Sequence, residues 1–264
     1  MGLVFDIRSA QLYNSWSHSP QGRTVEKFVE VLIKDLLDPQ QGERVLDIGC
    51  GFGDHLLFLN QLGLDISGVD ASPYMLSRAK ERLGHRCSLR KGKAEDLPFD
   101  DNEFDLSIMI NTLEFLDDPL QALREAGRVT NRRIFIGVLN SLSWLFLRSK
   151  LQGFFRESLL KHVRFYHFWQ LKAYIQAAFG PVPLSWRSSH LRPPQGGGSG
   201  ASLGGPWGLD HWPIGSLLGL QIDIGYSLKT ENLPLKLRLE KTKQSTADGV
   251  TRGSMNSAKK RLMT

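Results

Sequence analysis

The sequence has 264 residues, 41% of them hydrophobic and 23% charged, which is enough for a sizeable core and excludes a chain that is disordered throughout. The net charge of +6 comes wholly from Lys236–Thr264, where eight basic residues face two acidic ones; the other 235 residues hold 25 of each sign. This excess predicts a solvated tail more readily than a nucleic-acid or anionic-membrane contact.

The N-terminus and the apolar runs argue against a secreted or membrane-spanning protein. The start, MGLVFDIRSAQ, lacks the basic region and apolar run of a signal peptide. The longest apolar-rich stretch, Ile134–Leu147, is interrupted by Asn140 and two serines and is shorter than the roughly 20 residues of a spanning helix. We therefore expect a cytoplasmic protein in which Cys50 and Cys87 are reduced thiols. Neither cysteine has metal-ligand spacing, so no metal site is predicted.

The first elements predicted in chain order are a helix, a strand and a glycine-rich turn. Apolar residues at helical spacing in TVEKFVEVLIKDLL predict a helix that starts after a Thr24 cap and ends before Asp38-Pro39. RVLDI predicts a strand, GCGFG a turn, and DHLLFLNQL a helix. DISGVD predicts a second strand, and SPYMLSRAKERL a helix with Ser72 as its cap and Pro73 at its first position.

The same alternation continues to Leu139. CSLRKG predicts a third strand, FDLSIMI a buried strand, DPLQALREAGRV a helix and RRIFIGVL another strand. Strands that alternate with helices in this way predict a doubly wound α/β fold with a parallel sheet. Ligands of such sheets bind beyond the carboxyl ends of the strands, so the site is expected there.

Beyond Leu139 the pattern changes. Residues 144–169 are rich in aromatic and basic residues and predict helix, whereas VPLSWRSS and LQIDIGYSLK alternate as an antiparallel strand pair would. Between these two strands, residues 192–208 are rich in Gly, Pro and Ser, which predicts a mobile loop.

The glycine turn, Gly49–Gly53, links the first strand to the following helix. Glycine permits a tight turn and close approach of a ligand to the backbone, and the helix presents free N–H groups to that ligand. A dinucleotide-binding turn would carry a further glycine at position 54, which is Asp54 here. An acid at this position disfavours a pyrophosphate and suits a ligand with ammonium and sulfonium groups. No Gly-Lys-Ser/Thr follows, which excludes a P-loop.

Two acidic residues flank the turn. Asp70 ends the second strand, 19 residues after Gly51, and can accept hydrogen bonds from both hydroxyls of a ribose; alternatively it caps the helix near Ser72. Asp47 lies in an otherwise apolar strand and needs partners, which turn amides or a ligand ammonium would provide.

A further acidic pair, Glu95 and Asp96, follows the third strand. One of these carboxylates could accept from an adenine amino group, with the backbone N–H groups of Ala94 and Glu95 beside it. Alternatively the segment is a solvated acidic loop.

In combination these segments resemble the class I S-adenosylmethionine-dependent methyltransferases, specifically the small-molecule branch called methyltransferase type 11. The motifs, which span about Val45–Leu139, are VLDIGCGFG, GVDAS, KAEDLPFDDNEFDLSIMINTLEFLDDP and ALREAGRV. The resemblance implies S-adenosyl-L-methionine as the cofactor. It also implies a Rossmann-like, doubly wound, seven-stranded sheet, mostly parallel, with an antiparallel C-terminal strand pair.

The resemblance also implies where the cofactor is held. The methionine part would lie against Asp47 and the glycine turn, the ribose against Asp70, and the sulfonium near Asn111. The adenine would lie beside Ala71 and Met75, with its edge toward residues 94–96. The cofactor-binding residues expected are Asp47, Gly49, Cys50, Gly51, Gly53, Asp70, Ala71, Met75, Ala94, Glu95, Asp96 and Asn111.

The N-terminal stretch YNSWSHSPQGRTVEKF resembles the start of many family members, in which aromatic residues help to close the site. That implicates Tyr13 and Trp16 as substrate or lid residues; alternatively they only pack a helix. The domains expected are a helical lid region over 1–40, a cofactor-binding core over 41–140, substrate-side helices with the strand pair over 141–230, and a disordered basic tail over 231–264.

The chain departs from the family at two places. It has Glu114 and Phe115 where many relatives carry histidine after the fourth strand, and VTNRRIFI where relatives have Pro-Gly-Gly. Methyl transfer depends on alignment and exclusion of water, which can contribute about 7–11 kcal/mol, so no particular catalytic residue is required. If the acceptor arrives protonated, the candidate bases are Glu114, His162, Tyr166 and His167. The histidines and aromatics of this stretch could instead be the packed entry to a helix.

The predicted function is therefore methyl transfer to a small or lipid-like acceptor, with residues 144–169 forming much of the acceptor pocket wall. One alternative is a non-catalytic partner or regulatory protein that binds the same cofactor. Another is an NAD-linked enzyme, which Asp54 disfavours. No nucleic-acid partner is expected, and the sequence selects neither the acceptor nor the oligomeric state.

Overall fold

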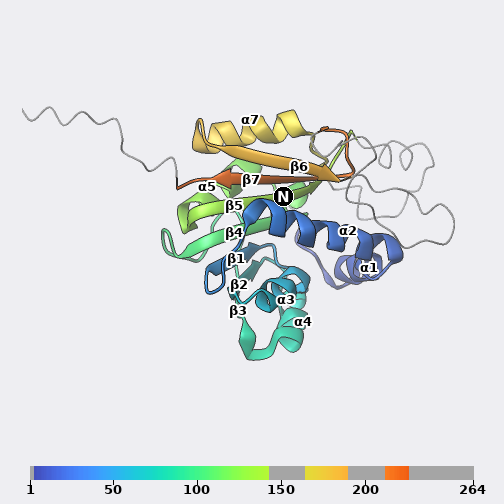
Figure 1. Cartoon of the computed structure of the whole chain (residues 1–264). Coiled ribbons are helices and arrows are strands. Elements are labelled where there is room, and N and C mark those ends of the chain that lie inside the picture. Colours follow the sequence, from blue (N-terminus) through green and yellow to red (C-terminus); the bar gives the residue numbers. More distant parts are fainter. Residues whose placement is uncertain (1–2, 143–163, 190–211, 226–264) are drawn as a thin grey trace, which may run out of the picture. The chain divides into compact units, whose positions relative to one another are not determined.

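The computed structural model describes residues 3–142, 164–189 and 212–225 (Figure 1). The predictions for residues 144–163, including His162, and for the 192–208 loop and the 231–264 tail lie outside the described residues. The helices are α1 (Ile7–Ser17), α2 (Pro20–Leu32), α3 (Asp54–Gln61), α4 (Pro73–Leu83), α5 (Pro119–Val129) and α7 (Phe168–Phe179). The strands are β1 (Arg44–Ile48), β2 (Asp65–Asp70), β3 (Ser88–Lys91), β4 (Phe104–Ile110), β5 (Thr130–Leu139), β6 (Leu184–Ser189) and β7 (Leu217–Asp223).

The seven strands form one sheet in the order β3-β2-β1-β4-β5-β7-β6, which can be followed in Figure 1. Strands β1 to β5 pair parallel with one another, and β7 pairs antiparallel with both β5 and β6. This arrangement confirms the predicted Rossmann-like fold with an antiparallel C-terminal pair. The order changes direction between β1 and β4, and that is the point at which doubly wound sheets bind ligands.

Helix starts follow local side-chain chemistry. Ser72 accepts from the Met75 N–H and Pro73 opens α4, as predicted. The predicted start of α2 at a Thr24 cap is wrong, because the helix begins at Pro20 with Ser19 as its N-cap. Thr24 lies inside the helix, where its hydroxyl donates to the Pro20 carbonyl at 2.8 Å. The helical stripe continues through a π-helical turn, Ile33–Leu37, and ends at Asp38.

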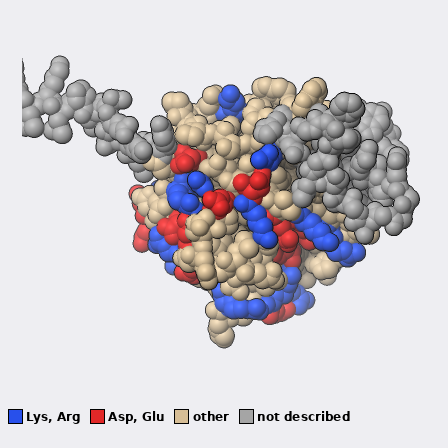
Figure 2. Space-filling view, viewed as in Figure 1, with Lys and Arg blue, Asp and Glu red and all other residues tan. Residues whose placement is uncertain are grey.

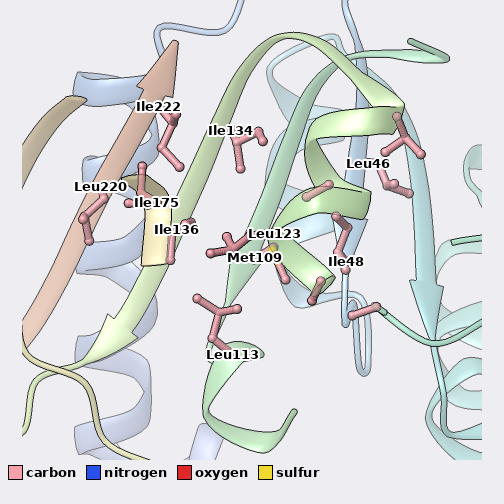
Figure 3. Close-up of a cluster of buried hydrophobic side chains, with 14 of the residues drawn as sticks. Leu46, Ile48, Met109, Leu113, Leu123, Ile134, Ile136, Ile175, Leu220 and Ile222 are labelled. Atoms are coloured by element: carbon pink, nitrogen blue, oxygen red, sulfur yellow. The ribbon is translucent and has the colours of Figure 1, made fainter. Parts of the chain in front are cut away.

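Helices cover both faces of the sheet. One face carries α5 and α7, and Figure 3 shows Leu123 and Ile175 of these helices meeting apolar side chains of β1, β4, β5 and β7. The other face carries α2, α3 and α4. In β1, Leu46 and Ile48 belong to the first core and Val45 to the second, because successive side chains of a strand alternate between faces. Asp47 therefore projects to the same side as Val45.

The charged surface of the described residues is mixed in sign. On the face shown in Figure 2, basic and acidic side chains lie interspersed. Ion pairs among the described residues include Arg44 with Asp105 at 3.1 Å and Arg132 with Glu43 at 2.5 Å. Within the described ranges, no helix is both long enough and apolar enough to cross a membrane.

Candidate functional site

A cleft opens at the carboxyl ends of β1, β2 and β4, where the strand order changes direction. Its floor is the glycine turn after β1, its sides come from the ends of β2 and β4, and residues 3–5 with Tyr13 cover it. The structure therefore brings together at one edge the segments that the sequence predicted to meet there.

All three glycines of the turn have positive φ, but they differ in what a Cβ at each position would contact. Gly49, Gly51 and Gly53 have φ values of 79°, 52° and 76°. A Cβ on Gly49 would lie 2.5 Å from the Thr112 hydroxyl, and one on Gly53 would lie 2.7 Å from a Leu83 methyl, so these two glycines permit packing. A Cβ on Gly51 would meet nothing closer than 3.7 Å. Gly51 thus leaves room on the cleft side of the turn, as a ligand cradle requires.

Asp70 is fixed by the backbone and faces the cleft. Its two carboxylate oxygens accept from the N–H groups of Gly51 at 2.9 Å and Ser72 at 2.7 Å. Burial raises the pKa of Asp70, and these amide donors oppose that shift. The helix cap is Ser72 itself, so Asp70 supports the turn rather than capping α4. Each oxygen has a second lone pair, which leaves capacity for two further donors.

Two more polar side chains at this edge have atoms without partners. Asp47 is 1% exposed, and its Oδ2 has no hydrogen-bond partner among the described residues. Burial raises the pKa of Asp47 well above the ordinary range, and the carboxylates of Asp70 and Asp54 add to the shift. Asn111 lines the cleft with its Oδ1 buried and unpartnered within the same ranges, and its backbone has a φ of 50°. Buried polar atoms without partners and left-handed non-glycine residues concentrate at functional sites.

The N-terminal segment is tied to both sides of the cleft. The Ser72 hydroxyl donates to the Phe5 carbonyl at 2.6 Å, and the Leu3 N–H donates to the Phe115 carbonyl at 3.0 Å. Tyr13 lines the cleft and stacks against Phe52 at 6.5 Å between ring centroids. Burial, with a further contribution from Asp54 and Glu26, raises the pKa of the Tyr13 phenol, which stays neutral.

Trp16, the other predicted lid residue, does not line the cleft. The centroid of its ring lies 5.7 Å from that of Tyr13, and the side chain packs against the core beneath α2. Of the two predicted lid residues, only Tyr13 therefore lines the cleft.

Asp54 has an ion-pair partner that the sequence did not reveal. Its carboxylate accepts from Arg82 of α4 at 2.5 Å, and the same guanidinium donates to the Phe52 carbonyl at 3.1 Å. Asp54 lines the cleft as expected, but this pairing offsets much of the negative charge on which the argument against a pyrophosphate was based.

The candidate bases among the described residues form hydrogen bonds outside the cleft. Glu114 is 1% exposed and accepts from the Leu139 N–H at 3.0 Å; burial raises its pKa to about 7. The Tyr166 hydroxyl donates to the Leu113 carbonyl at 3.3 Å within the core. His167 is the N-cap of α7, where its side chain accepts from the Gln170 N–H. None of these three side chains lines the cleft.

The cleft contains most of the predicted cofactor-binding set and several residues that were not predicted. Asp47, Gly53, Glu95 and Asp96 do not line it, and the last two lie at the turn around an isolated bridge between Lys93 and Asp96. The lining residues from the predicted set are Gly49, Cys50, Gly51, Asp70, Ala71, Met75, Ala94 and Asn111. The unpredicted ones include Phe5, Phe52, His55, Thr112 and Phe115.

His55 could have been noticed in the sequence, since it is a polar residue in the first turn of a helix that otherwise reads DHLLFL. Phe5 and Phe115 line the cleft because the N-terminal segment folds over the edge of the sheet. No local sequence pattern predicts that contact.

Part of the chain is similar in sequence to known proteins. Residues 46–133 match the family described as methyltransferase domain. An uncharacterized methyltransferase of Synechocystis is 42% identical over 82 residues, which cover 31% of this chain and 37% of that protein. The chloroplastic tocopherol O-methyltransferase of Arabidopsis thaliana is 29% identical over 128 residues, covering 46% of this chain and 37% of that protein. The matched region thus spans about two fifths of these relatives' length.

The fold resembles solved structures over a longer range. One neighbour is an S-adenosylmethionine-dependent methyltransferase of Thermotoga maritima described as a possible histamine N-methyltransferase. It superposes with a TM-score of 0.63 at 22% identity and covers 82% of this chain and 96% of the neighbour. At this identity the likeness concerns the fold alone, over a larger share of the chain than residues 46–133.

Proposed function

Because residues 46–133 match the methyltransferase domain family, we propose that the chain is a class I S-adenosylmethionine-dependent methyltransferase that transfers a methyl group from S-adenosyl-L-methionine to a small or lipid-like acceptor. The observation that carries this proposal is the set of polar groups around the glycine turn. Asp70 is pre-oriented by two backbone amides, and buried oxygens of Asp47 and Asn111 lack partners among the described residues.

These residues fit the chemistry of the cofactor. Its amino-acid end carries an ammonium group, whose positive charge near the turn would make the buried Asp47 carboxylate behind it less unfavourable. The ribose hydroxyls would donate to the free lone pairs of Asp70. Gly51 leaves the space that a ligand lying against the backbone would fill.

When bound, the cofactor supplies an electrophilic methyl group on a sulfonium, whose sulfur is the leaving group. The contribution of this chain is then to hold the two reactants in line and to keep water out. Tyr13 and Phe5, which cover the cleft, would exclude water. The Asn111 oxygen at the end of β4 would lie near the positive sulfonium end and stabilise it there.

Apolar side chains of the cleft support a small or lipid-like acceptor. The apolar residues that line the cleft include Leu3, Val4, Ile110, Phe115 and Leu116. Tocopherol, named as the substrate of one relative, is a lipid-like phenol, and such a molecule would suit this lining. Within the cleft, catalysis would depend on positioning, since Glu114, Tyr166 and His167 do not line it.

The first test is ligand binding. Calorimetric titration of the purified chain with S-adenosylhomocysteine and, in parallel, with NAD should give binding of the former. Asp70→Ala should weaken that binding by about tenfold or more, because two charge-assisted hydrogen bonds are lost. Asp65→Ala is the matched control, since Asp65 lies exposed at the opposite end of the same strand. Binding of NAD alone would contradict the proposal.

The second test is turnover. Transfer of label from methyl-labelled S-adenosylmethionine to a panel of quinones, phenols and lipids should release S-adenosylhomocysteine in proportion to one product. Binding without any transfer across the panel would favour the alternative of a non-catalytic cofactor-binding protein.

A further inference from the structure

The chain between β3 and β4 forms one wall of the cleft from irregular backbone. Apart from one isolated bridge, residues 92–101 form no helix or strand, yet Gly92 and Ala94 line the cleft. The Gly92 N–H donates to the Asp70 carbonyl at 3.1 Å, so this wall adjoins the residue proposed to hold the ribose. A wall without regular structure needs hydrogen-bond partners from other elements to keep one conformation.

Arg128, in the last turn of α5, supplies most of these partners. Its Nη1 donates to the Phe99 carbonyl and to Asp101 Oδ1, both at 2.8 Å. Its Nη2 donates to the Leu97 carbonyl at 3.0 Å. Glu125, on the same helix, accepts from Arg128 Nε and Nη2 at 2.8 Å. All five N–H donors of the guanidinium are thus used. A surface ion pair by itself contributes little to stability, but a planar group with every donor engaged restricts the segment it binds.

The same segment is held at two further points. The Leu97 N–H donates to Glu125 Oε2 at 2.9 Å, so both backbone polar groups of Leu97 are paired with side chains of α5. Arg90 of β3 donates to the Pro98 carbonyl at 2.7 Å, and its guanidinium lies 4.7 Å from the centroid of the Phe99 ring. Three consecutive carbonyls of this segment therefore accept from guanidinium groups of β3 and α5.

Packing connects this segment to the cleft. A Cβ on Gly92 would lie 2.7 Å from Cδ of Pro98, so Pro98 packs directly against the Gly92 backbone. Ala94, Leu97 and Phe99 are at most 8% exposed and belong to the core cluster that also contains residues of α5. Movement of the segment would therefore move the wall at Gly92 and Ala94.

On this basis, and resting on the proposed function, we infer that Arg128, with Glu125 and Arg90, positions the wall of the cleft that contacts the nucleobase of the cofactor. None of the three side chains lines the cleft, so they act on the ligand through residues 92–99. The base is the group concerned because the wall adjoins Asp70. Of the two groups that the ribose carries, the amino-acid arm is assigned to the glycine turn, which leaves the base for this wall.

The test compares two ligands that differ in the base. S-Adenosylhomocysteine carries adenine, whereas S-ribosylhomocysteine has the ribose, sulfur and amino-acid end without it. In calorimetric titrations of the full chain, Arg128→Ala should weaken S-adenosylhomocysteine binding by about tenfold, because binding then has to order a wall that the wild type already holds in place. The affinity for S-ribosylhomocysteine, measured by competition, should stay within about twofold of the wild type, since this ligand makes no contact with the wall. Arg128→Lys keeps the charge with fewer donors and should recover part of the loss.

Hydrogen exchange locates the effect along the chain. In ligand-free Arg128→Ala the amides of residues 92–101 should exchange faster than in the wild type, and saturating S-adenosylhomocysteine should restore their protection. Arg44→Ala is the matched control. Arg44 donates two side-chain hydrogen bonds to Asp105, and it lies at the end of β1 remote from the glycine turn. This variant should leave both affinities and the exchange of residues 92–101 unchanged.

The outcomes separate this inference from the proposed function. If the wild type binds neither ligand, the proposed function fails and the inference with it. If the wild type binds S-adenosylhomocysteine but Arg128→Ala binds it equally well, or weakens both ligands equally, the positioning role is wrong while the proposed function stands. If S-ribosylhomocysteine does not compete in the wild type, exchange decides: equal protection of residues 92–101 in the two proteins overturns the role. Should Arg128→Ala not fold, the same comparisons with Arg90→Ala decide, since that side chain is exposed.

Discussion

Replacing Gly51 by alanine tests whether the ligand lies against the glycine turn. Gly51 has a φ of 52°, so alanine there adopts a left-handed conformation that costs about 1–2 kcal/mol. Its Cβ would lie 3.7 Å from Met75 Sδ, an ordinary contact, so no steric term is added in the ligand-free protein. The expected fall in melting temperature is about 2–4 °C for each kcal/mol.

The effect of Gly51→Ala on binding should be larger than the effect of strain alone. The new methyl group would occupy the space in which the ligand approaches the backbone. Overpacking of a fitted contact costs about 1–3 kcal/mol, which corresponds to a loss of affinity of roughly fivefold to more than a hundredfold. Calorimetric titration with S-adenosylhomocysteine measures this loss directly, and thermal unfolding of the ligand-free variant measures the strain.

Gly42→Ala is the matched control. Gly42 also has a positive φ, 86°, and a Cβ there would meet no atom within 4 Å. It lies outside the cleft, so the variant should lose a similar stability and keep wild-type affinity. If Gly51→Ala binds S-adenosylhomocysteine as well as the wild type does, or if both variants lose affinity equally, the cleft beside Gly51 is not the binding site.

Two further predictions concern stability and the N-terminal cover. Burial raises the pKa of Glu114 from 4.5 to about 7, so the folded state holds this proton more tightly than the unfolded state. The free energy of unfolding should therefore fall by about 3 kcal/mol as pH rises across this window. Glu114→Gln keeps an acceptor for the Leu139 N–H and removes that slope; urea unfolding at about pH 5 and pH 8 measures it, and parallel curves for the two proteins would count against the assignment. Ser72→Ala removes the donor to the Phe5 carbonyl, so trypsin should cut faster at the exposed Arg8, whereas Ser72→Thr should behave as wild type. Equal cleavage of all three proteins would mean that this hydrogen bond does not hold the segment.

The fold and the glycine turn were predictable because their signals are local. Alternation of apolar runs with amphipathic stretches identified β1 to β5 and the antiparallel pair, and Ser72-Pro73 fixed the start of α4. Asp70 was found because a parallel strand ends where its neighbours end, so its position along the chain already fixes the sheet edge on which it lies. The start of α2 lies at Ser19-Pro20 and not at Thr24, because a serine cap followed by proline at the first helical position is the stronger local signal.

The remaining features depend on contacts between residues far apart in sequence. Arg82 meets Asp54 across 28 positions, and the Leu139 N–H meets the Glu114 carboxylate across 25, so neither pairing could be inferred from residue type. Burial decided which polar atoms lack partners: Glu114 accepts from the Leu139 N–H through Oε1, whereas its Oε2 and the Nε2 of His55 have no hydrogen-bond partner among the described residues. The sequence by itself determined the fold and the edge of the sheet at which the cleft opens, because backbone conformation and strand parity are encoded locally. Only the tertiary structure decided which side chains have unpaired polar atoms at that edge, because hydrogen-bond satisfaction is a property of the packed chain.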